Sequence, residues 1–178
     1  YTTGIDKFVV HLVHNSGPES NHPEWEPASF VERIVYTSLT TIISGVGFAL
    51  LIVSALVITG SSGGFRIGVL WGIGGFAAFI LAPAVGLPPE LPGMMKAELI
   101  ERQFWWLGTA IVTATGLWIL VFYTNPSLFI LASILLLAPH VLGAPIQHSI
   151  ESSIIPAELA AKFSTVSIGV NFIFWLML

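Results

Sequence analysis

Residues 103–150 read QFWWLGTAIVTATGLWILVFYTNPSLFILASILLLAPHVLGAPIQHSI and contain no Asp, Glu, Lys or Arg. A charged side chain at the centre of a bilayer costs about 2.5–3.5 kcal/mol on insertion scales, whereas water imposes no such restriction. This uncharged run of 48 residues therefore indicates that lipid surrounds this part of the chain. Because a helix crosses the hydrocarbon core in about 20 residues, the run has the length of two spans.

Other long windows without charge lie between Arg33 and Arg66, between Arg66 and Glu90, and after Lys162. Hydrophobic residues make up 54% of the chain. We therefore predict an all-α, polytopic transmembrane helix bundle that forms a single integral membrane domain over residues 1–178. The net charge of −4 argues against nucleic acid as a partner, and the lack of Cys excludes disulfides and thiolate metal sites within the chain.

Glycine and proline divide the apolar sequence into helices. The Gly60–Gly64 turn ends the first span, and Asn125-Pro126-Ser127 interrupts the long window because a residue before proline avoids the α region. We expect the second span to lose helical continuity near Pro83. Five spans are predicted, the last of them incomplete: 34–59, 65–85, 103–123, 127–141 and 163–178. Apolar residues between Tyr1 and Val13 predict the tail of a sixth span at the N-terminus.

Two pairs of motifs indicate an internal repeat. LAPAVGLP at 81–88 is similar to LAPHVLGAP at 137–145, and AELIERQF at 97–104 is similar to AELAAKF at 157–163. Each copy predicts a helix, a proline-rich polar loop and a second helix. Because two spans separate the copies, both should run in the same direction through the membrane.

The alternation of spans places the polar loops on one side of the membrane. The His- and Glu-bearing segment 14–32, the Gly86–Arg102 loop and the Leu142–Lys162 loop should share this side, together with all ten acids and all five histidines. Thr109, Thr113 and Thr115 add hydroxyl groups to the third span.

The N-terminal segment offers ligands for a divalent transition metal. His11 and His14 are three residues apart and would share one face of a helix, while His22 and Glu24 follow in the sequence HPEWEP. Imidazole and carboxylate together suit Co²⁺, Ni²⁺, Zn²⁺ or Cu²⁺. The alternative is an ordinary interfacial loop that Trp25 anchors at the lipid headgroups.

Two further ligands are predicted near helix ends. Glu90 lies in LPPELPG at 87–93, where three prolines hold its direction, and His140 directly follows Pro139. His140 is either a pore-mouth or cofactor ligand, or a helix-end histidine that bonds carbonyls freed by proline. The predicted metal-binding residues are His11, His14, His22, Glu24, Glu90 and His140. We predict structural roles for SFVE at 29–32, typical of a capping box, and for Gly64, Gly68 and Gly72 as a ridge for helix packing.

Several motifs resemble the CbtA family of probable cobalt transporter subunits. They are LWG at 70–72, GFAAF at 75–79, RQFWWLGT at 102–109, PAEL at 156–159 and NFIFW at 171–175. The resemblance implies a membrane-embedded component of cobalt uptake in the plasma or inner membrane of a cell, with the His/Glu face outside the cytoplasm. It also implies other membrane subunits, among them a small partner with a His-rich tail.

Two functional hypotheses follow from the sequence. In the first, the His/Glu face captures Co²⁺ and passes it to the helix bundle. In the second, the chain is a structural or accessory subunit of a larger membrane complex and contributes at most one metal or cofactor ligand. An enzyme is not predicted, because the sequence shows neither a nucleophile with its base nor a nucleotide-binding loop.

Overall fold

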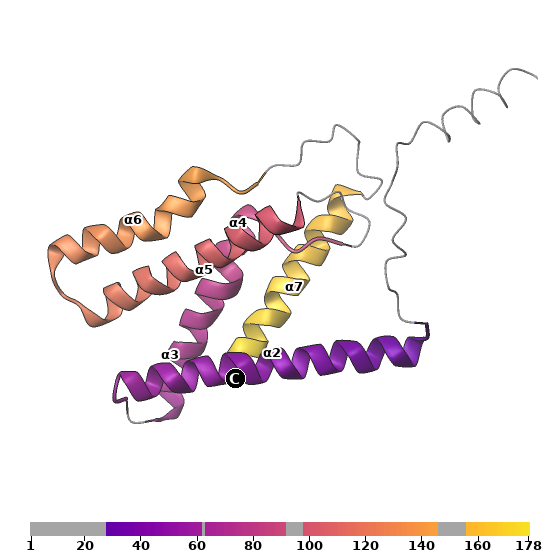
Figure 1. Cartoon of the computed structure of the whole chain (residues 1–178), viewed down its shortest axis with the longest axis horizontal. Helices are drawn as coiled ribbons and strands as arrows, with labels where there is room; N and C mark the ends of the chain where they lie inside the picture. Colours follow the sequence, from indigo (N-terminus) through magenta and orange to yellow (C-terminus); the bar gives the residue numbers. More distant parts are fainter. Residues whose placement is uncertain (1–27, 62, 92–97, 146–155) are drawn as a thin grey trace, which may run out of the picture. The chain divides into compact units, whose positions relative to one another are not determined.

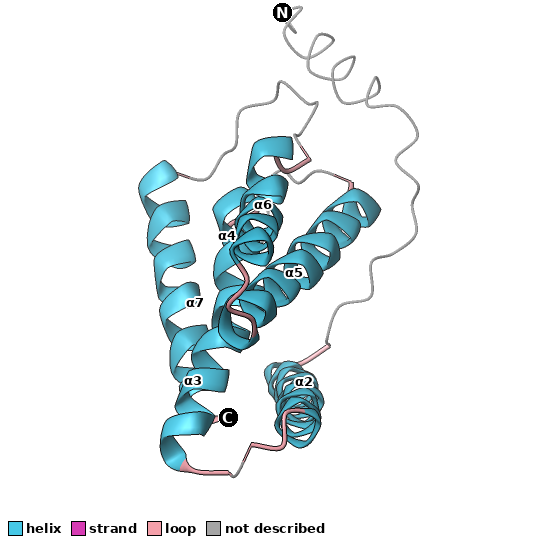
Figure 2. Ribbon diagram, turned by 90° about the vertical axis from the view of Figure 1, so that its left-hand side faces the viewer, coloured by secondary structure: helices cyan, strands magenta, loops and turns pink. Residues whose placement is uncertain are grey.

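The structure is a computed structural model that describes residues 28–61, 63–91, 98–145 and 156–178 (Figure 1). The described residues form helices joined by short loops and contain no strand, which confirms the all-α prediction (Figure 2). The helices are α2 (Phe30–Ile58), α3 (Phe65–Phe76), η1 (Ala77–Leu81), α4 (Ala82–Gly86), α5 (Leu99–Phe122), α6 (Pro126–Leu142) and α7 (Ala157–Met177).

The chain divides into two compact units, and the division falls within α2. The first unit ends at Ile43 and the second comprises Ser44–Leu178. In the first unit, the start of α2 is capped by its own side chains: the Glu32 N–H donates to Ser29 Oγ at 3.1 Å, and the Ala28 N–H donates to Glu32 Oε2 at 2.9 Å. These two bonds confirm the predicted capping role of Ser29 and Glu32.

Within the described residues, four helical segments are long and apolar enough to cross a membrane: Phe30–Ile58, Phe65–Gly86, Leu99–Phe122 and Ala157–Met177. The prediction of an incomplete last span was wrong, because α7 begins at Ala157 and has 21 residues. Glu158 is favoured in the first turn by the helix dipole, and Lys162 can extend its ammonium group toward water, so neither charge ends the helix. The shorter apolar helix is α6, with 17 residues.

The predicted loss of helical continuity near Pro83 was also wrong. The helix continues through η1, a π-helical turn in which the Ala82 N–H donates to the carbonyl of Ala77, five residues back. Proline has no N–H and its ring clashes with the carbonyl four residues back, and a wider turn accommodates it. The helix therefore extends to Gly86.

The two copies of the repeat end their first helices in the same way. The Leu87 N–H donates to Pro83 O at 2.8 Å, and the Gly143 N–H donates to Pro139 O at 3.0 Å. In each copy the bond joins the proline carbonyl to the residue four positions later, and a polar loop follows. The shared geometry supports the two-helix repeat predicted from the sequence.

Helices α3 and α7 pack closely at two glycines. A Cβ added at Gly72 would collide with the backbone oxygen of Trp175, and one added at Gly75 would collide with the ring of Trp175. At Gly64 and Gly68, in contrast, the corresponding space is open. The predicted glycine ridge was therefore correct only at Gly72, and the contact continues at Gly75 instead.

Aromatic rings fill the space around this contact. The Trp175 side chain is 2% exposed. Its ring stacks on the ring of Phe79 with the centroids 5.6 Å apart, and its centroid lies 4.7 Å from that of the Phe48 ring in α2. Phe76 packs edge-on against Phe172 at 5.0 Å. These contacts join the second half of α2 to α3, η1 and α7.

Helices α5 and α6 form an antiparallel hairpin (Figures 1 and 2). The turn between them is fixed by Asn125, whose side-chain oxygen accepts a hydrogen bond from the Ser127 N–H at 2.9 Å, and by Pro126 in the first turn of α6. This confirms the break predicted at Asn125. Gly116 brings the helices together, because a Cβ there would lie 3.2 Å from Ala132 O.

Candidate functional site

Two long-range hydrogen bonds gather the polar loops at one end of the helices. Trp105 Nε1 donates to Gly143 O at 2.9 Å, which joins the start of α5 to the end of α6. Ser164 Oγ donates to Pro89 O at 2.6 Å, which joins α7 to the loop after α4. We call this region, where α4 and α6 end and α5 and α7 begin, the loop end.

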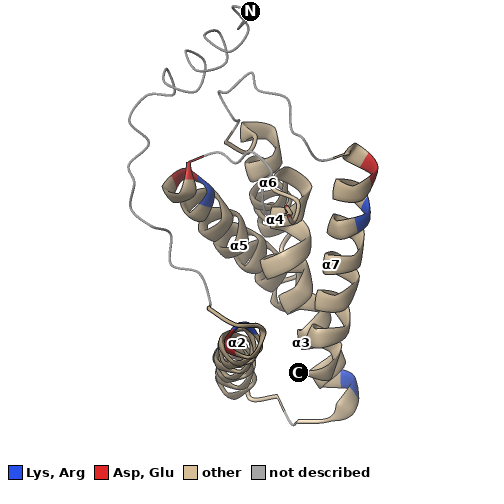
Figure 3. Cartoon of the chain, turned by 90° about the vertical axis from the view of Figure 1, so that its right-hand side faces the viewer, with Lys and Arg blue, Asp and Glu red and all other residues tan. Residues whose placement is uncertain are grey.

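In the described part of the second unit, the charged residues lie near the ends of the helices, and most of them lie at the loop end. Figure 3 shows acidic and basic residues at the starts of α5 and α7, which lie at the loop end, and a basic residue at the start of α3. The basic residue is Arg66, in the first turn of α3. It lies at the start of the continuous helix Phe65–Gly86, whose other end is at the loop end. Within this unit, the described loops therefore gather as the alternation of spans predicted.

The main charged contact at the loop end is an ion pair between Glu90 and Arg102. Arg102 Nη2 lies 2.9 Å from Glu90 Oε2, and the two side chains are 22% and 15% exposed. The carboxylate of Glu90 is thus already held by a guanidinium, which sequence reasoning did not anticipate. The only sequence signal was that residues of opposite charge occur on the two sides of one short proline-rich loop.

A cavity of about 330 Å³ lies beside this ion pair, bounded by η1, α4, the loop after α4, α5 and α7. Its polar lining residues are Arg102, Gln103 and Asn171. Asn171 Nδ2 donates to Ser167 O at 2.9 Å, within its own helix. Because the described residues that line it include a guanidinium and no carboxylate, a cation in the cavity would depend on Glu90 to offset the charge of Arg102.

His140 lies in the last turn of α6 and is half-buried. Its Nδ1 is buried and has no hydrogen-bond partner among the described residues. One prediction was that this side chain bonds backbone carbonyls freed by proline, and Nδ1 makes no such bond. The nitrogen is therefore available to a ligand or to water.

The predicted metal-binding residues divide into two groups. His11, His14, His22 and Glu24 lie outside the described residues, so their arrangement stays a prediction. Glu90 and His140 are described, but within the described ranges no three His, Asp or Glu side chains come together as a metal site. The complete six-residue set thus remains a hypothesis.

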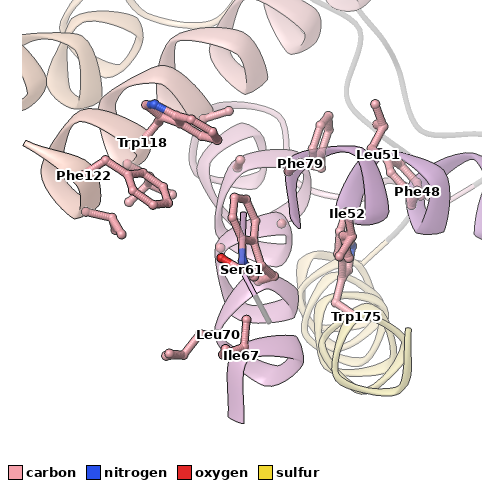
Figure 4. Close-up of a pocket in the computed structure, with 18 residues that line it drawn as sticks. Phe48, Leu51, Ile52, Ser61, Ile67, Leu70, Phe79, Trp118, Phe122 and Trp175 are labelled. Carbon is pink, nitrogen blue, oxygen red and sulfur yellow. The ribbon is translucent and has the colours of Figure 1, made fainter. Parts of the chain in front are cut away.

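A second cavity, of about 520 Å³, lies among α2, α3, η1, α5 and α7 and extends to Ser61 and Phe122, away from the loop end (Figure 4). Aromatic and aliphatic side chains line it, including Phe79, Trp118, Phe122 and Trp175, and Ser61 adds a hydroxyl. None of the described residues lining it is charged, so it offers a cation no counter-charge. Groups suited to ion chemistry are concentrated instead at the loop end.

Comparisons with curated proteins and with solved structures gave no match to this chain. The family model described as probable cobalt transporter subunit (CbtA) matches residues 7–178. This match covers nearly the whole sequence and includes every helix described above. The chain therefore belongs to the CbtA family of probable cobalt transporter subunits.

Proposed function

We propose that this chain is the membrane-embedded subunit through which a transporter takes up Co²⁺, and that the ion enters at the loop end. The observation that carries the proposal is the family membership over residues 7–178. Further support comes from the gathering of Glu90, Arg102 and His140 at one end of helices that are otherwise apolar.

Glu90 would act as an exchangeable ligand. Both side chains of the ion pair keep part of their surface exposed, and a divalent cation has twice the charge of the guanidinium, so it can compete with Arg102 for the carboxylate. Arg102 would then be an internal competitor that holds the carboxylate in place between ions. The side-chain amide of Gln103, in the adjoining cavity, would provide a neutral oxygen to the incoming ion.

Other predicted ligands would bind the ion before and after it reaches Glu90. His11, His14, His22 and Glu24 would collect the ion outside the cytoplasm, and the unpaired Nδ1 of His140 would receive it beyond Glu90. A small partner with a His-rich tail would deliver the ion to this face. Neutral imidazole and carboxylate are suitable ligands for Co²⁺, and Ni²⁺, Cu²⁺ or Zn²⁺ would be competing ions.

Initial rates of cobalt uptake in cells lacking other cobalt importers test this path. Glu90→Gln and His140→Asn should each lower uptake about tenfold, which corresponds to about 1.4 kcal/mol. Glu101→Gln is the matched control for the first variant, because Glu101 is an exposed acid in the first turn of α5. His148→Asn is the control for the second. Wild-type uptake by both Glu90→Gln and His140→Asn at equal membrane abundance would refute the path.

Arg102→Gln separates exchange from a purely structural ion pair. If Arg102 competes with the ion, its loss should lower the Co²⁺ concentration needed for half-maximal uptake. If the pair only stabilises the fold, the variant should lower the amount of folded protein and leave that concentration unchanged.

The proposed capture ligands require a separate measurement. The double variant His11→Ala/His14→Ala should weaken Co²⁺ binding about tenfold by calorimetry. Because the chain has no Cys, single cysteines at positions 22 and 148 can report which compartment each position faces. Labelling of the two positions from opposite compartments would contradict a shared extracytoplasmic face.

A second candidate function is that of an accessory subunit in a larger membrane complex. The ion pair that occupies Glu90 favours this alternative, because an unpaired carboxylate would be a better metal ligand. Purification without a tag in mild detergent distinguishes the two. Stoichiometric recovery with several other chains and no bound cobalt would favour the accessory role, whereas a complex that retains cobalt would favour transport.

A further inference from the structure

One stripe of α5 faces α6. Trp105, Thr109, Thr113 and Gly116 are spaced by four, four and three residues, so they lie on one side of the helix. At one end of this stripe Trp105 bonds Gly143 O, and at the other a Cβ on Gly116 would lie 3.0 Å from Leu136 Cγ. Thr109 and Thr113 lie between these two contacts, on the buried side of α5 that packs on α6 and, at Trp105, also on Gly86 of α4.

The hydroxyl groups of these two threonines are buried without a partner. Thr109 is 1% and Thr113 is 4% exposed, and neither Oγ1 has a hydrogen-bond partner among the residues that the structure describes. Many other helical hydroxyls donate to the carbonyl four residues back: those of Thr40, Thr41, Ser54, Thr59, Thr115, Ser133 and Thr165. This local bond is available to any helical threonine. Its absence at Thr109 and Thr113 leaves both hydroxyls free for a group between the helices.

The facing part of α6 also offers unpaired polar atoms. Pro139 is buried inside α6 and has no N–H, so the Leu135 carbonyl lacks its usual donor within the helix. His140, the next residue, has its buried Nδ1 unpaired in the described structure. These two hydroxyls, the Leu135 carbonyl and the imidazole nitrogen belong to stretches of α5 and α6 that pack together, and none of them carries a formal negative charge.

We infer that water molecules bind between α5 and α6 along Thr109, Thr113, Pro139 and His140. A buried water needs two to four polar partners, and these groups provide both donors and acceptors. At Thr109 and Thr113 a bare divalent cation fits less well, because no carboxylate lies among these hydroxyls to balance its charge. Bound water would extend from His140 at the loop end toward Thr113 in the interior of the bundle. This inference goes beyond the proposed cobalt path and does not depend on it.

The test uses the full chain in lipid nanodiscs, freed of metal so that no bound cation contributes. Thr109→Val and Thr113→Val keep the shape of the side chain and remove the hydroxyl. If the hydroxyls bind water, each variant should lower the unfolding temperature, whereas removal of a truly unpaired hydroxyl should raise it. Thr115→Val is the matched control, because its hydroxyl is exposed and bonded to Ile111 O, and it should have little effect.

Radiolytic hydroxyl-radical labelling gives a second, direct readout of bound water. Relative to the intrinsic reactivity of each side chain, buried Pro139 should be labelled several-fold more than Phe76, which is also buried but lies away from this interface. The labelling of Pro139 should fall in Thr113→Val. Labelling no stronger than that of Phe76, or a raised unfolding temperature in either valine variant, overturns the inference.

Discussion

Replacement of Gly72 by alanine should loosen the contact between α3 and α7. The added Cβ would collide with the backbone oxygen of Trp175, and a backbone atom cannot rotate away as a side chain can. The two helices would have to separate by on the order of 1 Å to restore normal contact distances. Trp175, which is 2% exposed and packs on Phe79, would lose part of its contacts in the process.

The size of the effect follows from a comparison with Gly68→Ala. Both variants gain about 1 kcal/mol from the higher helix propensity of alanine, but the space at Gly68 is open. Overpacking of a close contact costs about 1–3 kcal/mol, so Gly72→Ala should be less stable than Gly68→Ala by that amount. Reversible unfolding of both variants in one mixed-micelle system measures the difference. Equal free energies of unfolding would refute the close approach of α3 and α7.

Two further substitutions examine the loop end. Trp105→Phe removes the hydrogen bond to Gly143 O and should lower the free energy of unfolding by about 1 kcal/mol. Trp106→Phe is the control, because that side chain is 37% exposed, and it should lower the free energy of unfolding less. The same unfolding measurement compares the two variants. Gly143→Ala should destabilise the end of α6 by about 1–3 kcal/mol, because Gly143 has φ 82° and ψ 153°, a conformation that side chains rarely adopt. Faster amide hydrogen exchange at the end of α6 in Gly143→Ala measures this effect, and exchange at the wild-type rate would contradict it.

Most of the fold could be predicted from the placement of charge. The cost of a charge in lipid is large compared with differences in helix propensity, so uncharged windows locate spans even where the local sequence is ambiguous. Errors arose where one residue was given too much weight. Lys162 was taken as a boundary although a long basic side chain can lie near a helix start, and Pro83 as a break although a π-helical turn accommodates it.

The candidate site was less predictable because it depends on how the helices are rotated and packed. Glu90 could be singled out from its three neighbouring prolines, but its pairing with Arg102 requires the loop to fold back on α5. Thr109, Thr113 and Thr115 look equivalent in the sequence. Only the structure distinguishes them, because it buries the first two without a partner among the described residues while Thr115 bonds its own helix.

The two copies of the repeat accommodate the same proline differently, and this difference separates their chemistry. In the first copy a π-helical turn precedes Pro83. Two residues of this turn, Phe79 and Ile80, line the same cavity as Arg102, which pairs with Glu90. In the second copy α6 stays α-helical through Pro139, so the Leu135 carbonyl lacks its usual donor within the helix, and His140 Nδ1 is buried without a partner among the described residues. One copy thus offers charged groups and the other neutral polar groups. An ion that leaves water needs a counter-charge first, and it then needs polar atoms in place of its hydration shell. We therefore expect an ion to reach the charged groups of the first copy before the neutral polar groups of the second.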